Sequence, residues 1–313
     1  MTRVAAIDCG TNTIKLLVTD VDKGSGTQHD LVREMRVVRL GQGVDRTGRL
    51  ADEALARVFA AVEEYAEVVD RHGATATRFV ATSASRDASN ADVFAAGVRS
   101  RLGVELEVVT GDEEAQLSFD GATRSLPPLP GPVAVLDIGG GSTELVVGDQ
   151  PAEDGSVAGR VRAGRSLDVG SVRLTERLMP SDPPTPDEVA AAGRVVDDAL
   201  DTLPAHGVVL RDAPTLVGVA GTVTTVASLL LGLQAWDRDR VHHSSFPVDD
   251  VHALAARVLA LTAAAREAIG VPRGRSDVIG AGAVILDRVL SRSGADRLTV
   301  SDSDILDGIA WSM

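Results

Sequence analysis

Two stretches of this sequence, about 130 residues apart, share a pattern that limits the folds open to the chain. The first is AAIDCGTNTIKLLV (5–18) and the second is AVLDIGGGSTELVV (134–147). In each, an apolar run leads to an aspartate, a short segment of glycine and hydroxyl residues follows, and a second apolar run begins. A charged residue stands seven positions after each aspartate: Lys15 after Asp8, and Glu144 after Asp137. The repetition predicts two similar β-hairpins, one in each of two related lobes.

The rest of the chain alternates between helix-like and strand-like segments. Apolar residues recur at helical spacing over 52–70, and Gly73 ends that helix. Thr110 and Glu113 have the spacing of a capping box, so another helix begins there. The other apolar patterns predict strands at 77–84, 104–109 and 297–300, helices at 90–102, 187–203, 248–261 and 276–290, and a short helix at the C-terminus. This alternation favours the α/β class.

One segment, LVGVAGTVTTVASLLLGLQAW (216–236), contains no charged residue and is long enough to span a membrane. Gly218, Gly221 and Thr222 divide it into a β-like run and a helix-like run. We therefore expect a buried strand, a turn and a helix in place of a transmembrane span.

The charge balance restricts the partners of the chain. A formal net charge of −14 disfavours bulk electrostatic binding to nucleic acid or to an anionic membrane. An anionic ligand must therefore be held locally, by backbone N–H groups, a few arginines or a metal ion. The single cysteine, Cys9, excludes an intramolecular disulfide, which suits a reducing cytoplasm.

The two turns have the composition of phosphate-binding loops. Glycine and hydroxyl residues in a hairpin turn can direct several backbone N–H groups into one concavity that binds anions. Side chains at the glycine positions would keep phosphate oxygens away from those amides. A flanking aspartate can hold Mg²⁺, which takes one or two carboxylates together with phosphate oxygens and water. The alternative is two ordinary glycine-rich turns with Asx-type aspartates. Two copies with matched acids favour phosphate handling.

Eight stretches resemble, in family order, the exopolyphosphatase and guanosine pentaphosphate phosphatase family of the actin-like ATPase and sugar kinase superfamily. They are AAIDCGTNTIKLLV, VATSASRDASNA, VVTGDEEAQLSF, VLDIGGGSTELVVG, SLDVGSVRLTER, GVAGTVTTVASL, RSDVIGAGAVIL and VSDSDILDGIA. The resemblance implies an α/β fold of two ribonuclease-H-like lobes with the active site in the cleft between them. We expect the first lobe over 1–123, with the terminal helix 304–313 as a candidate addition, and the second over 124–303.

The resemblance also implies a function. We expect an exopolyphosphatase that releases terminal orthophosphate from inorganic polyphosphate by Mg²⁺-assisted attack of water. Because longer relatives continue into a helical domain, whereas this sequence stops at Met313, we expect a preference for short chains. The alternatives are a guanosine pentaphosphate (pppGpp) phosphatase, an ATP-dependent sugar or acetate kinase-like enzyme, and a catalytically silent polyphosphate- or nucleotide-binding regulator.

Specific residues follow from the family motifs. Glu114 matches the catalytic glutamate, with Glu113 as the fallback, although both could merely complement the positive end of a helix. The implied metal ligands are Asp8, Asp137 and Glu144, for Mg²⁺ with Mn²⁺ as the alternative. The implied phosphate-binding residues are Thr11, Asn12, Lys15, Arg86, Gly139, Gly140, Gly141, Ser142, Gly221 and Thr222. Of these, Lys15 and Arg86 could equally be ordinary surface residues.

Other features of the sequence carry less information. No P-loop or G-x-S-x-G motif occurs. Five arginines at 160, 162, 165, 173 and 177 could form a track for a polyanion or simply a solvated face. Family members are often dimers, so the resemblance allows a homodimer, but we expect neither nucleic acid nor a membrane as a partner.

Overall fold

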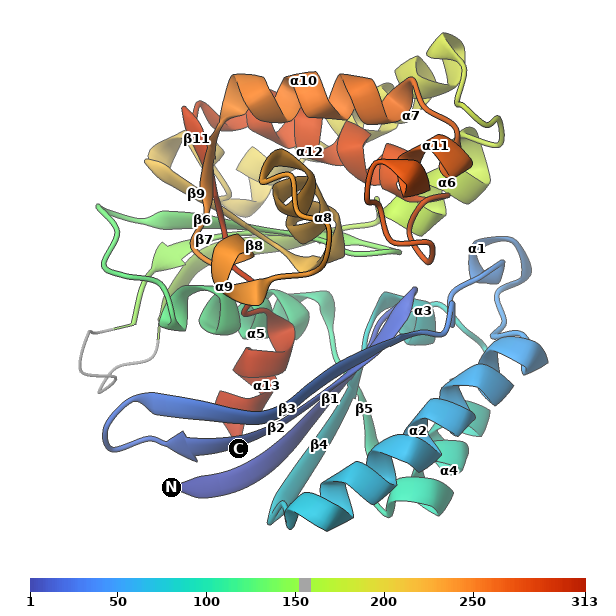
Figure 1. Cartoon of the computed structure of the whole chain (residues 1–313), viewed down its shortest axis with the longest axis vertical. Helices are drawn as coiled ribbons and strands as arrows, with labels where there is room; N and C mark the ends of the chain where they lie inside the picture. The colour runs from blue at the N-terminus through green and yellow to red at the C-terminus, as the bar shows by residue number, and fades with distance from the viewer. Residues whose placement is uncertain (152–158) are drawn as a thin grey trace. The chain divides into compact units, whose positions relative to one another are not determined.

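The computed structural model describes residues 1–151 and 159–313 of the chain. Two compact units are present (Figure 1). Unit 1 comprises Met1–Arg124 and Asp304–Met313, and unit 2 comprises Ser125–Gln150 and Arg160–Ser303. Each unit is built on a β-sheet of its own.

The sheet of unit 1 has the strand order β3-β2-β1-β4-β5. Its strands are β1 (Thr2–Cys9), β2 (Thr13–Asp22), β3 (Thr27–Val37), β4 (Ala76–Ala81) and β5 (Leu106–Val108). The first three pair antiparallel, and β4 and β5 run parallel to β1. The helices of this unit are α1 (Val44–Thr47), α2 (Asp52–His72), α3 (Ser83–Arg86), α4 (Ala91–Leu102), α5 (Gly111–Arg124) and α13 (Ile305–Ser312).

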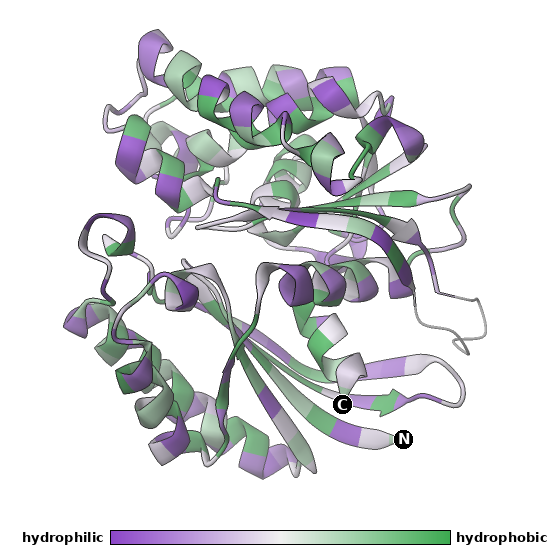
Figure 2. Ribbon diagram, turned by 180° about the vertical axis from the view of Figure 1, so that it is seen from behind, coloured by the Kyte–Doolittle hydropathy of each residue, from purple (hydrophilic) through white to green (hydrophobic). Residues whose placement is uncertain are grey.

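The two faces of this sheet pack against different helices. On β1, Ile7 and Cys9 belong to the core shared with α2 and α4, whereas Val4 and Ala6 belong to a smaller core shared with α5 and α13. Polar and apolar residues alternate along α2 in Figure 2, as expected of a helix with one buried face. Because side chains alternate along a strand, Asp8 lies on the α5 and α13 face of the sheet.

Unit 2 has a six-stranded sheet in the order β10-β11-β9-β6-β7-β8. Its strands are β6 (Val133–Ile138), β7 (Thr143–Asp149), β8 (Arg160–Leu167), β9 (Thr215–Val219), β10 (Ser245–Pro247) and β11 (Arg297–Val300). Its helices are α6 (Ser171–Leu178), α7 (Pro186–Leu200), α8 (Ala220–Leu230), α9 (Arg238–Val241), α10 (Val248–Leu259), α11 (Ala263–Ala268) and α12 (Ile279–Ser293), with short 3₁₀ helices η1 (Leu203–His206) and η2 (Leu210–Asp212). The main core of the unit lies between the sheet and α7, α8, α10 and α12.

The two sheets repeat one topology. The order β3-β2-β1-β4-β5 of unit 1 recurs in unit 2 as β8-β7-β6-β9-β11, with the same parallel and antiparallel pairings. Both predicted hairpins are therefore present, at equivalent places in the two sheets. The predicted α/β class with two ribonuclease-H-like lobes is confirmed.

The sequence patterns missed three strands, of which β10 has only three residues, and misjudged the end of another. Strands β3 and β8 form one edge of each sheet, and their charged, partly exposed residues do not give an apolar run. The strand predicted at 77–84 ends at Ala81, because the chain then turns into α3. The uncharged segment 216–236 forms most of β9 and all of α8, as predicted. No helix among the described residues is long and apolar enough to cross a membrane.

Candidate active site

The predicted site residues of unit 1 follow the ends of three neighbouring strands. Thr11 and Asn12 follow β1, Arg86 lies in α3 after β4, and Glu114 lies in the first turn of α5 after β5. Since β1, β4 and β5 are parallel, these segments begin at the same edge of the sheet. The hydroxyl of Thr11 lies 3.0 Å from that of Ser83, which joins the first turn to the start of α3. The structure thus brings these residues to one edge, where the ligands of open α/β sheets bind.

The two adjacent glutamates at the start of α5 have different surroundings. Arg86 Nη1 donates to Glu114 Oε2 at 2.6 Å and to the Val109 carbonyl at 3.0 Å. Glu114 is only 7% exposed. The Glu113 carboxylate instead accepts from Arg78 Nη2 at 2.7 Å, and its side chain is 45% exposed. The geometry therefore distinguishes Glu114 from the fallback, and it gives Arg86 a contact that orients this glutamate.

Lys15 is held between two carboxylates of unit 1. It lies directly opposite Asp8 in the first hairpin, and its Nζ is 3.6 Å from Asp8 Oδ2. The same ammonium is 2.5 Å from Asp304 Oδ2. Burial alone would raise the pKa of Asp304, but the positive charges of Lys15 and Arg33 outweigh it, so this pKa lies below the usual range. Sequence reasoning did not single out Asp304, although it lies in the family-like stretch VSDSDILDGIA.

The backbone of the first turn is fixed through its carbonyl groups. The Thr11 carbonyl accepts from the Gly41 N–H at 2.8 Å, and the Asn12 carbonyl accepts from the Val38 N–H at 3.0 Å. In a trans peptide the carbonyl and the following N–H point in opposite directions. The N–H groups of Asn12 and Thr13 are therefore directed away from the loop that anchors the turn.

The second turn has the same closing hydrogen bond as the first. The Gly139 N–H donates to the Ser142 carbonyl at 3.0 Å, and the Gly10 N–H donates to the Thr13 carbonyl at 2.9 Å. These residues occupy matching positions in the two hairpins. The repeated sequence pattern is therefore a repeated backbone structure.

The carbonyls of the second turn are also anchored, in this case by α6. The Gly139 carbonyl accepts from the Ser171 N–H at 3.0 Å, and the Gly140 carbonyl accepts from the Val172 N–H at 2.8 Å. By the same geometry, the N–H groups of Gly140 and Gly141 are directed away from α6. Consecutive amides arranged in this way can bind an anion such as a phosphate group.

The approach of Gly170 to this turn leaves no room for a side chain. A Cβ at Gly170 would lie 2.4 Å from the Gly140 carbonyl oxygen. Gly170→Ala should therefore displace the turn, cost about 1–3 kcal/mol of stability and reduce activity. The control is Gly193→Ala in α7, where a Cβ would meet nothing within 4 Å and helix propensity should improve. Thermal unfolding and activity of both variants test this prediction. Equal melting temperatures for Gly170→Ala and wild type would contradict it.

Two carboxylates lie side by side in the second hairpin. Asp137 and Glu144 are direct cross-strand partners, on the face of the sheet opposite the main core of unit 2. They are 8% and 1% exposed, and the Ser166 hydroxyl donates to Glu144 Oε1 at 2.7 Å. Like charges directly opposite each other destabilise a sheet. A divalent cation would relieve that repulsion.

Two carboxylates are a donor set that fits Mg²⁺ or another hard divalent cation. Carboxylate oxygens are hard ligands, and Mg²⁺ usually takes one or two of them together with phosphate oxygens and water. In the part of the chain that the structure describes, no three or more His, Cys, Asp or Glu side chains form a group that could hold a metal ion.

Gly221 and Thr222 begin α8 after β9, which runs parallel to β6. They therefore lie at the same edge of the sheet as the second turn. Arg275 Nη1 donates to the Gly221 carbonyl at 2.8 Å, and a Cβ at Gly221 would lie 2.3 Å from Arg275 Cζ. Thr222 is buried against Gly282 of α12. Arg275 is a further candidate that sequence reasoning missed, and its only signal was its place in the stretch RSDVIGAGAVIL.

The five arginines of 160–177 are divided between β8 and the start and end of α6. Arg162 makes a bidentate ion pair with Asp149, at 2.6 and 2.9 Å. The Arg173 N–H donates to the Gly140 carbonyl at 3.1 Å, so this residue adjoins the second turn. A track for a polyanion stays a prediction.

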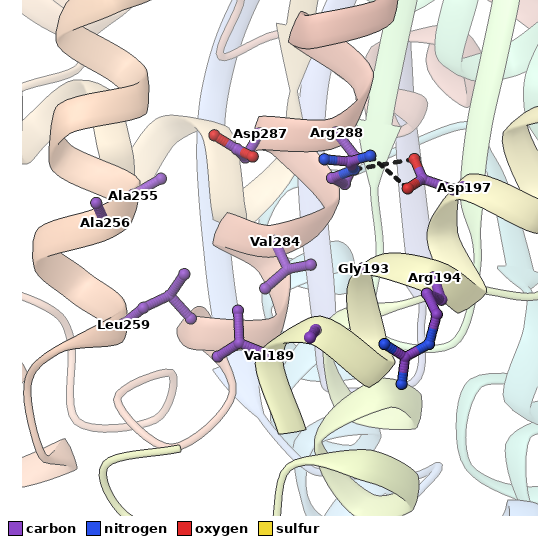
Figure 3. Close-up of a pocket in the computed structure, with 11 residues that line it drawn as sticks. Val189, Gly193, Arg194, Asp197, Ala255, Ala256, Leu259, Val284, Asp287 and Arg288 are labelled. Carbon is purple, nitrogen blue, oxygen red and sulfur yellow. Dashed lines mark hydrogen bonds and ion pairs between the residues drawn. The ribbon is translucent and has the colours of Figure 1, made fainter. Parts of the chain in front are cut away.

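Two cavities of unit 2 are separate from these residues. One, of about 450 Å³, lies between α7, α10 and α12, and Figure 3 shows the Asp197–Arg288 ion pair at its wall. Another, of about 310 Å³, is lined by residues of α6, α11, α12 and their connecting segments. None of the predicted site residues lines either cavity.

Comparison with known proteins identifies the family of the chain. The model of the Ppx/GppA phosphatase family matches residues 17–313. The chain belongs to this family. Among Ppx/GppA relatives, Exopolyphosphatase 2 of Mycobacterium tuberculosis is 47% identical, over 100% of this chain and 99% of the relative.

Solved structures of the Ppx/GppA family extend the comparison. A crystal structure of an exopolyphosphatase-like protein has a TM-score of 0.93 at 41% identity, covering 99% of this chain and 97% of that chain. The Ppx/GppA enzyme of Aquifex aeolicus has a TM-score of 0.81 at 30% identity, covering 100% of this chain and 99% of that chain.

Proposed function

We propose that this chain is an exopolyphosphatase, which removes terminal orthophosphate from inorganic polyphosphate by Mg²⁺-assisted attack of water. The observation that carries the proposal is the 47% identity, along the whole of both chains, with a protein named Exopolyphosphatase 2. The two anchored turns support it, because a polyphosphate offers the anionic oxygens that such amides bind.

Glu114 has the properties of the base in this reaction. Hydrolysis of a phosphoanhydride requires a positioned water and neutralisation of charge on the transferred phosphoryl group. Arg86 orients the Glu114 carboxylate through a contact of 2.6 Å. In the proposed mechanism, Glu114 orients the attacking water and accepts its proton.

The turn residues bind the phosphate groups in the proposed mechanism. The amides of Asn12, Gly140 and Gly141 point away from the segments that anchor the turns, toward the side where phosphate oxygens would lie. The remaining predicted phosphate contacts are Thr11, Lys15, Arg86, Gly139, Ser142, Gly221 and Thr222.

Asp137 and Glu144 would hold Mg²⁺ in unit 2, and Asp8 in unit 1 stays a predicted ligand. A bound Mg²⁺ neutralises phosphate charge and orients the group to be transferred. Mn²⁺ is the alternative ion.

A phosphate-release assay tests the proposal against its rivals. Polyphosphate, pppGpp and ATP are offered separately at matched concentrations, with Mg²⁺. We expect kcat/KM to be highest for polyphosphate. The alternative substrate pppGpp is not favoured, because the relative that matches this chain over its whole length is named an exopolyphosphatase. A higher kcat/KM on pppGpp would overturn the assignment, and transfer from ATP to a sugar or acetate would indicate a kinase.

Size-fractionated polyphosphate in the same assay tests the predicted preference for short chains.

A further inference from the structure

The carboxylate of Asp304 has two separate contacts. It is the N-cap of α13, and its Oδ1 accepts from the Leu306 N–H at 3.0 Å. Its Oδ2 accepts from Lys15 Nζ at 2.5 Å. One oxygen therefore caps the helix, and the other holds the ammonium group of Lys15.

The position of Asp304 is fixed by the packing of α13 on α5. A Cβ at Gly121 would lie 1.8 Å from the Asp304 carbonyl oxygen, and a Cβ at Gly308 would lie 2.0 Å from the Leu117 carbonyl oxygen. The two helix backbones thus meet at glycines. A capping box adds to this, since the Asp304 N–H donates to Asp307 Oδ2 at 2.9 Å. Asp304 consequently has little freedom to move.

Lys15 has unequal distances to its two carboxylates. Its ammonium lies 2.5 Å from Asp304 but 3.6 Å from Asp8, the residue directly opposite it in the hairpin. A lysine side chain is long and flexible, so loss of the nearer carboxylate should let the ammonium move closer to Asp8. Of these two carboxylates, Asp304 is the one in direct contact with the ammonium of Lys15.

We propose that Asp304 is a positioning residue: it holds Lys15 away from Asp8, so that the Asp8 carboxylate can serve its predicted role toward Mg²⁺. This inference rests on the proposed function, in which Asp8 is a metal ligand. The second hairpin has Glu144 in place of Lys15, so no such restraint is needed there. The two hairpins therefore have the same backbone structure but differ in the side chain opposite the aspartate.

Asp304→Asn separates the two contacts of Asp304. Asparagine caps helices as well as aspartate does, and its carbonyl oxygen can still accept from the Leu306 N–H. Its amide NH₂, however, cannot accept from an ammonium group. The fold should therefore persist, while Lys15 moves to Asp8.

The position of Lys15 can be observed without any assay of activity. The sequence contains only two lysines, Lys15 and the exposed Lys23. In protein labelled with ¹³C and ¹⁵N on lysine, the Lys15 side-chain signal should shift in Asp304→Asn, with the Lys23 signal as internal reference. The matched control is Asp20→Asn in β2, which removes a partly buried carboxylate of the same sheet that pairs with Arg3. It should lower the melting temperature but leave the Lys15 signal in place.

The rate measurement then distinguishes positioning from a structural role. Asp304→Asn should raise the Mg²⁺ concentration for half-maximal rate by roughly tenfold, because the ammonium competes for Asp8. In the control Asp20→Asn, this concentration should stay within about twofold of wild type. An unshifted Lys15 signal in Asp304→Asn, or an unchanged Mg²⁺ concentration for half-maximal rate, would overturn the inference. Failure of the proposed function would appear differently, as wild-type protein that releases no phosphate from polyphosphate.

Discussion

Replacing Glu114 with glutamine is expected to lower kcat on polyphosphate by on the order of 10²-fold or more, with KM nearly unchanged. Glutamine retains the size of the side chain and an oxygen that can accept from Arg86. It cannot accept the proton of the attacking water. The loss should therefore affect the chemical step and not binding. Steady-state kinetics of variant and wild type on one polyphosphate preparation give the comparison.

The neighbouring glutamate provides the matched control. Glu113→Gln changes the same chemical group one residue earlier in α5, but that group is exposed and paired with Arg78. Such surface ion pairs contribute little, so kcat should stay within about twofold of wild type. If Glu113→Gln lost activity while Glu114→Gln retained it, the assignment of the base would be wrong.

The second large effect is expected at Asp137. Asp137→Asn removes one of the two opposed carboxylates of the second hairpin, so the remaining site should bind Mg²⁺ more weakly. In Asp137→Asn, the Mg²⁺ concentration that gives the half-maximal rate should be at least tenfold higher than in wild type, because a buried charged ligand is lost. In wild type, removal of divalent cations with a chelator should abolish phosphate release.

Asp149→Asn is the control for this experiment. Asp149 ends the same strand as Glu144, but its carboxylate pairs with Arg162 at the surface. Its substitution should leave the Mg²⁺ dependence unchanged. Full wild-type activity in the presence of chelator would contradict the predicted metal requirement.

The parts of the fold that the sequence predicted depend on local chemistry. The hairpins could be predicted because each turn has its own glycine and hydroxyl residues. In each hairpin the charged residue seven positions after the aspartate is its cross-strand partner: Lys15 for Asp8 and Glu144 for Asp137. The edge strands β3 and β8 could not, because a half-exposed strand with charged residues lacks the apolar run that identifies a buried one.

The parts of the site that could not be predicted from the sequence depend on contacts between residues that are far apart in the chain. Lys15 and Asp304 are 289 positions apart, and they meet because α13 packs on the face of the sheet that Lys15 shares with Asp8. The choice between Glu113 and Glu114 could not be made from residue type either, since both lie in the first turn of α5 and both suit a helix N-terminus. Only the packing of Arg86 and Arg78 separates them.

The most direct test of the central claim is a time course of polyphosphate hydrolysis followed by ³¹P NMR. End groups, middle groups and orthophosphate give separate signals, so the number of chain ends can be followed as phosphate is released. If phosphate is removed from the chain ends, the orthophosphate signal should grow from the first turnovers while the signal of middle groups declines. The number of chain ends should not rise. An early increase in chain ends before orthophosphate appears would show internal cleavage and would contradict the assignment as an exopolyphosphatase.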